Sequence, residues 1–102
     1  MWVNEIDAEV LANYLRVNLM DIDYAEFNLL ESVIKAAKAY VREYTGLTPA
    51  ALNKHEDLAM AVMVVSQDMY DNRAMIADRN YVNETVRSLL DLHSVNLVGK
   101  GG

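Results

Sequence analysis

The sequence predicts an all-α protein, a small bundle of about four helices with a long second helix and a buried third one. Apolar residues recur at steps of three and four along most of the chain, which is the period of an amphipathic helix. Glycine and proline, which interrupt regular structure, are rare, at four and one of 102 residues. A chain of this length corresponds to one domain, expected over residues 1–98, and 99–102 are expected to form a flexible tail.

The first helix is predicted to begin at Asp7, whose carboxylate can cap the free N–H groups of the following turn. Its apolar face consists of Val10, Leu11, Tyr14 and Leu15. Residues 16–20 are expected to connect this helix to the next one. An acidic cluster over residues 21–26 then suits the positive end of a second helix dipole.

The second helix is the clearest element of the sequence. Its apolar stripe, with steps of three and four, consists of Phe27, Leu30, Ile34, Ala37, Val41 and Tyr44. Such a stripe indicates a helix that is packed along its whole length. Gly46 is expected to end the helix, because a left-handed residue is favoured there, and Pro49 is expected to prevent its resumption. Residues 45–54 are therefore predicted to be the main loop.

A third helix is predicted to begin at about His55 and to end near Arg73. One apolar stripe on it consists of Leu58, Ala61, Val62, Val65 and Met69. Met60, Met63 and Val64 fill most of the remaining face. A helix that is apolar nearly all round is buried on several sides. It is either the central helix of the domain or partly buried against another subunit.

The C-terminal part is predicted to contain one more short helix. Residues 75–82 have no period and are expected to be irregular. Asn83 is expected to cap the last helix, which carries Val86, Leu89 and Leu90. Residues 95–98 suit either a short strand or a docking arm. Residues 75–82 and the C-terminal tail are the segments expected to become ordered only on assembly.

Composition and charge exclude several classes of function. The absence of cysteine excludes disulfides and thiolate zinc sites. A net charge of −6 argues against a tight nucleic-acid binder, because such affinity comes from neutralising phosphates. The apolar run around residues 60–65 is far too short to span a membrane. Residues 1–11 carry acids and no basic region, so no signal peptide is expected there.

No catalytic motif is found, and neither an enzyme nor a cofactor is expected. The chain has no glycine-rich phosphate loop and no serine nucleophile in a recognisable setting. Its two histidines, His55 and His93, are predicted to lie in different elements. A zinc site would need both of them together with carboxylates. The favoured interpretation is that one histidine caps a helix start and the other closes a helix end.

Polar residues gather at the end of the third helix and are interpreted as a structural network. Paired acids can act in acid–base catalysis only in a water-poor cleft, of which the sequence gives no sign. Asp68 and Arg73 are instead expected to hold this helix end, within the subunit or across to a neighbour. The full set of structural or interface candidates is Asp68, Tyr70, Asp71, Asn72, Arg73, Met60, Met63, Val64 and Asn83.

Read in order, several segments resemble the family of bacteriophage and prophage head–tail connector proteins, often described as possible DNA-packaging proteins. The segments are 14–17 followed by Asp21 and Asp23, 34–41 closing on 44–46, 61–65, 68–73, and 83–90 with Leu92 and His93. The resemblance covers nearly the whole chain. Its specificity lies in the order and spacing of the segments, those at 68–73 and 83–93 above all.

The resemblance implies a virion protein at the head–tail junction, made in the cytoplasm of the bacterial host. Subunits would form a ring of about a dozen copies below the portal protein and extend the DNA channel toward the tail. Partners would be other copies of the chain, the portal protein, and tail-side connector or stopper proteins. DNA would pass without specific binding, which an acidic lumen favours. The alternative hypothesis is a helical interaction or regulatory module that binds a partner helix.

Overall fold

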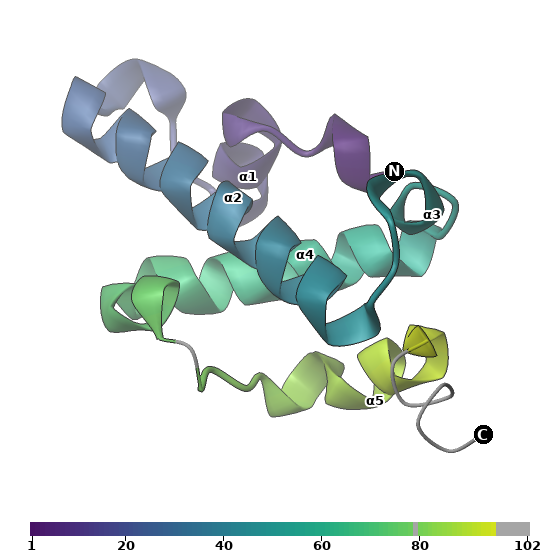
Figure 1. Ribbon diagram of the computed structural model, residues 1–102. Coiled ribbons are helices and arrows are strands. Elements are labelled where there is room, and N and C mark those ends of the chain that lie inside the picture. Colours follow the sequence, from purple (N-terminus) through teal and green to yellow (C-terminus); the bar gives the residue numbers. More distant parts are fainter. Residues whose placement is uncertain (79, 96–102) are drawn as a thin grey trace.

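A computed structural model describes residues 1–78 and 80–95 and confirms the all-α class (Figure 1). The elements, in chain order, are the 3-10 helix η1 (Val3–Glu5), α1 (Ala8–Leu15), the 3-10 helix η2 (Leu19–Asp21), α2 (Tyr24–Thr45), α3 (Pro49–Leu52), α4 (Glu56–Asp71), the 3-10 helix η3 (Arg73–Ala77) and α5 (Glu84–His93). Over these residues no strand forms, and no helix is long and apolar enough to cross a membrane. The predicted tail at 99–102 and most of the 95–98 segment lie outside the described residues.

The helix boundaries follow from capping residues that the sequence predicts. Asp7 caps α1, Asp23 caps α2 and Asn83 caps α5. Each does so by accepting a hydrogen bond from a backbone N–H of the first turn, which satisfies a donor that the helix leaves free. Gly46 ends α2 in the left-handed conformation, with φ at 73°, where a side chain would be disfavoured.

The core lies between α2 and α4, and α4 is its central helix. This helix packs most extensively against α2 and also contacts α1, α5, η1 and η3. Its buried residues are Leu58, Ala59, Ala61, Val62, Met63, Val65, Ser66 and Met69. From α2, four members of the predicted stripe are buried, Leu30, Ile34, Ala37 and Val41, together with Val33, which the stripe omitted. The sequence left two explanations for the apolar surface of α4. Its central position within one chain accounts for most of that surface.

Two apolar residues of α4 are not buried within the single chain, as the second explanation, burial against another subunit, allows. Met60 is 59% exposed, and Val64 is only half-buried. Phe27 and Tyr44, at the ends of the α2 stripe, are likewise half-buried rather than buried.

Two predicted loops contain helical turns. Pro49 does not merely prevent α2 from continuing, because it occupies the first turn of α3. Proline is tolerated there, since its missing N–H would have no partner within the helix. Thr48 caps this turn by accepting a hydrogen bond from the backbone N–H of Ala51 at 3.2 Å. In the 75–82 segment, predicted to be irregular, η3 extends to Ala77.

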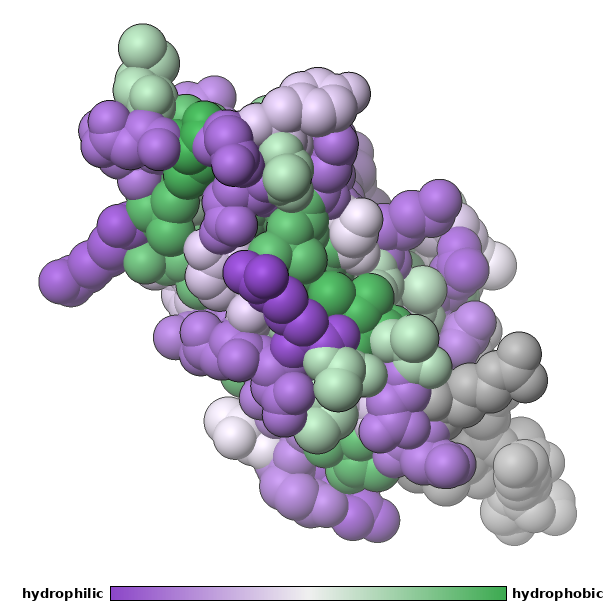
Figure 2. Space-filling view, turned by 90° about the vertical axis from the view of Figure 1, so that its left-hand side faces the viewer, coloured by the Kyte–Doolittle hydropathy of each residue, from purple (hydrophilic) through white to green (hydrophobic). Residues whose placement is uncertain are grey.

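The molecule is elongated, with principal extents of 51 × 26 × 19 Å. One end is formed by η2 and the start of α2, at the upper left of Figure 1. Figure 2 views the molecule from the left-hand side of Figure 1, where this end lies, and shows apolar residues in a diagonal band between polar ones. Met20 in η2 is 89% exposed and Tyr24, at the start of α2, is 80% exposed. This end therefore presents apolar side chains to solvent.

Candidate functional site

The polar residues at the end of α4 form two separate networks, and the first links α4 to α5. The hydroxyl of Tyr81 donates a hydrogen bond to Oδ2 of Asp68 at 2.6 Å. Nδ2 of Asn83 donates to the same carboxylate oxygen at 3.3 Å and to the Tyr81 oxygen at 3.0 Å. Tyr81 and Asn83 are both buried, so this network lies at the edge of the core. It fixes the chain just before α5 against α4.

Tyr40 extends this network to α2. Its ring packs edge-to-face on Tyr81, with centroids 4.9 Å apart, a favourable arrangement for aromatic pairs. Its hydroxyl accepts a hydrogen bond from the backbone N–H of Asn83 at 3.5 Å. Burial raises the pKa of both tyrosines, and the bond to Asp68 raises the pKa of Tyr81 further. Both phenols therefore remain neutral well into the alkaline range.

The second network links the end of α4 to the start of α2 through Glu26. The hydroxyl of Tyr70 donates a hydrogen bond to Oε1 of Glu26, and this bond raises the pKa of Tyr70. The guanidinium of Arg73 lies 3.7 Å from Oε2 of the same carboxylate. Asp68 and Arg73 therefore both contact neighbouring elements within the chain, but through different partners.

The remaining predicted residues lie in different surroundings. Met63 belongs to the core, and Met60 lies apart from the polar networks on the exposed side of α4. Asp71 and Asn72 are exposed at the end of the helix. A shallow depression between α4 and the start of α5 brings together Val64, Gln67, Asp68, Asp71, Val82, Asn83, Glu84 and Thr85.

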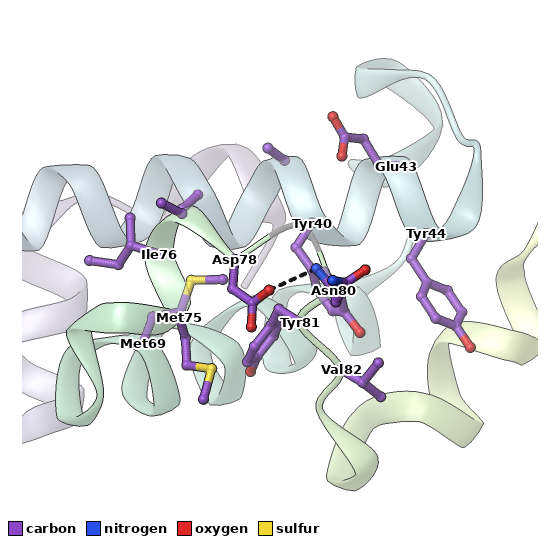
Figure 3. Close-up of a pocket in the computed structure, with 13 residues that line it drawn as sticks. Tyr40, Glu43, Tyr44, Met69, Met75, Ile76, Asp78, Asn80, Tyr81 and Val82 are labelled. Atoms are coloured by element: carbon purple, nitrogen blue, oxygen red, sulfur yellow. Dashed lines mark hydrogen bonds between the residues drawn. The ribbon is translucent and has the colours of Figure 1, made fainter.

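A groove that the sequence did not predict runs between α2 and the segment before α5. Its volume is about 910 Å³. Its lining comprises Ala36, Ala39, Tyr40, Glu43, Tyr44, Met69, Met75, Ile76, Ala77, Asp78, Asn80, Tyr81 and Val82 (Figure 3). Figure 3 shows Tyr40 and Tyr81 in the middle of this set, between Met75 and Ile76 on one side and Tyr44 on the other. The small side chains of Ala36 and Ala39 were the only signal in the sequence that α2 leaves room here.

The two histidines lie next to each other, although the sequence placed them in separate elements with separate roles. His55 occupies the N-cap position of α4, but its side chain makes no cap hydrogen bond. His93 is the last residue of α5, and its Nε2 lies 2.8 Å from Oδ2 of Asp57. This hydrogen bond lowers the pKa of Asp57. These three residues are the only group in the described part of the chain that could hold a metal ion.

No protein-family model matches the chain, and neither a curated protein nor a solved structure shows significant similarity to it.

Proposed function

We propose that the chain is a subunit of a bacteriophage or prophage head–tail connector, which assembles into a ring below the portal and extends the DNA channel toward the tail. The observation that carries this proposal is that two of the connector-like segments line one groove and that a third is joined to it by a hydrogen bond. Segment 34–46 contributes Tyr40 and Tyr44, segment 68–73 contributes Met69, and Tyr81 joins this groove to the segment that begins at Asn83. Residues that share a surface suit a common binding role.

A ring requires a head-to-tail contact between two different patches of the same chain. We assign the groove as the receiving patch. The inserting patch is the end of the molecule that carries Met20 and Tyr24. Tyr24 and Tyr44 lie at opposite ends of α2, about 30 Å apart at 1.5 Å per residue. The two patches therefore cannot satisfy each other within one chain, and each remains available to a neighbouring copy.

The chemistry of the groove suits such an insertion. Met69, Met75 and Ile76 supply flexible or branched apolar surface, and aromatic side chains lie beside them. Methionine adapts its shape to a partner, and aromatic rings contribute strongly at the centre of protein interfaces. An exposed methionine and tyrosine are complementary occupants for a groove of this kind.

The charge of the chain supports a place beside moving DNA. With 15 acidic and nine basic residues, the subunit carries a net negative charge, which repels the negatively charged phosphates of DNA. Affinity for DNA falls when cations are few, so a channel built from such subunits does not retain the genome. The proposed role requires protein contacts alone and no catalytic residue.

The assembly can be tested with concentrated, purified protein by light scattering and negative-stain imaging. We expect closed rings, either of the chain alone or on the portal protein encoded by the same genome. Met20→Glu should prevent ring formation because it places a charge in the inserting patch. Leu92→Glu is the matched control, since Leu92 is 82% exposed but belongs to neither patch. Persistent monomer in the presence of portal protein would overturn the proposal.

A helical interaction module is the second candidate, and the open groove is what favours it. An amphipathic helix of a partner could lie between α2 and the segment before α5, as helices do in other apolar grooves. Such a module would remain monomeric or dimeric at high concentration. Loss of partner binding on Ala77→Arg, without any ring of the wild-type chain, would identify this function.

A further inference from the structure

The start of α4 and the end of α5 bring three metal-ligating side chains together. His55 and Asp57 lie in and just before the first turn of α4, and His93 ends α5. The imidazole rings of His55 and His93 have centroids 4.5 Å apart. Nε2 of His93 lies 2.8 Å from Oδ2 of Asp57. One ligand atom from each residue lies within 4.8 Å of the other two.

Two imidazoles and one carboxylate form a donor set that is typical of zinc. Zinc binds nitrogen and oxygen at about 2.0–2.2 Å in a tetrahedron, which places its ligand atoms about 3.3 Å apart. The present spacing brackets that value, since Nε2 of His93 and Oδ2 of Asp57 are 2.8 Å apart and the three ligand atoms all lie within 4.8 Å of one another. Calcium and magnesium instead prefer oxygen ligands throughout, and this cluster offers them a single carboxylate beside two nitrogen ligands. Three protein ligands would leave one position for water.

We propose that His55, Asp57 and His93 form a zinc site that fastens the end of α5 to the start of α4. The side chain of His93 is only 18% exposed, so packing already orients it. The side chain of Asp57 is 49% exposed, which leaves the cluster open to an ion from solvent. The site is independent of the proposed ring, because none of the three residues lines the groove.

A hydrogen bond between His93 and Asp57 alone is the simpler explanation of this cluster. The role of His55 distinguishes that explanation from a zinc site. The pair does not need His55, whose side chain does not cap α4. A zinc site does need it as the third ligand. Removing His55 should therefore weaken zinc binding strongly and leave the fold of the zinc-free protein in place.

The test uses the full, untagged chain, because a polyhistidine tag would itself bind the ion. After treatment with EDTA and dialysis, the protein is titrated with zinc chloride by calorimetry, and its melting temperature is recorded. We expect one zinc ion per chain and a melting temperature that rises with zinc concentration, because the ion binds the folded state. The chain has only two histidines, so both imidazole signals in an NMR spectrum should shift at one equivalent.

Variants decide between a site and adventitious binding. His55→Ala and Asp57→Asn should each weaken zinc binding at least about tenfold. Asp71→Asn, at an exposed carboxylate in the last turn of the same helix, should leave affinity unchanged. Circular dichroism checks that each variant is folded. If His55→Ala does not fold, the conservative variant Asp57→Asn provides the test. No saturable binding to the wild type, equal affinity in the ligand variants, or zinc that only links chains together in light scattering would each overturn the proposal.

Discussion

The phenol of Tyr81 and the carboxylate of Asp68 are joined by a 2.6 Å hydrogen bond between residues 13 positions apart in the chain. This bond, together with those of Asn83, connects the end of the central helix to the segment that leads into α5. The same segment forms one wall of the groove. Stability of the fold and shape of the proposed interface therefore depend on the same contact.

Tyr81→Phe should destabilise the protein by about 1–3 kcal/mol, because the Asp68 carboxylate loses a donor at a half-buried position. The free energy of unfolding in urea measures the effect. Tyr14→Phe is the matched control, since Tyr14 is 41% exposed. Equal effects of the two substitutions would contradict a role for the Tyr81–Asp68 bond.

The same bond predicts a loss of stability in alkali. Burial and the bond to Asp68 raise the pKa of Tyr81 above its ordinary value of 10.0. The unfolded chain therefore loses the phenolic proton at lower pH than the folded chain does. The stabilisation that the protonated Tyr81 gives the folded state is complete below about pH 10 and is lost as pH rises above that value. Unfolding free energies measured from pH 8 upward should fall more steeply above pH 10 in the wild type than in Tyr81→Phe.

Ile34→Ala should reduce the free energy of unfolding by about 2–5 kcal/mol. Ile34 is 6% exposed in the seam between α2 and the rest of the core, so its truncation leaves a cavity. The neighbouring Lys35 is exposed, and Lys35→Ala should change stability by less than about 0.5 kcal/mol. A small effect at Ile34 would show that α2 is not packed along this face.

Arg73→Ala separates stability from assembly. The side chain of Arg73 is 64% exposed, and its ion pair with Glu26 spans 3.7 Å. Exposed pairs of this kind contribute at most about 1 kcal/mol, so thermal unfolding should change little. Ring formation should nevertheless weaken if Arg73 also contacts a neighbouring copy. Unchanged stability together with unchanged assembly would remove Arg73 from both roles.

A mixing experiment tests the head-to-tail contact. Met20→Glu leaves the groove intact, and Ala77→Arg fills the groove but leaves the inserting patch intact. Each variant alone should be monomeric, whereas an equimolar mixture should form heterodimers by light scattering. A mixture that remains monomeric, although wild-type rings form, would show that other surfaces make the contact.

The sequence predicted those features that depend on local chemistry. The caps at Asp7 and Asn83 and the end of α2 at Gly46 follow from residue type and position alone. The apolar surface of α4 left two explanations open, a central position or burial against another subunit, and periodicity alone could not decide between them. The exposed residue Met60 of α4 could not be distinguished from Met63, because periodicity does not show where neighbouring helices stop covering a helix.

The features that the sequence did not predict arise from tertiary packing. His55 and His93 are 38 positions apart, and only the antiparallel course of α4 and α5 brings their rings to 4.5 Å. The groove depends on the path of residues 75–82, which has no period from which to place it. In the polar cluster, proximity in sequence suggested one network, but the helix turns Asp68 toward Tyr81 and Tyr70 toward Glu26.

The decisive measurement for the proposed ring is the mass of the assembly that the concentrated wild-type chain forms on the portal protein. Light scattering should detect a closed complex of many subunits, and imaging should show a ring with an axial channel. A chain that remains monomeric or dimeric under these conditions, with portal rings present and intact, would contradict the assignment as a head–tail connector.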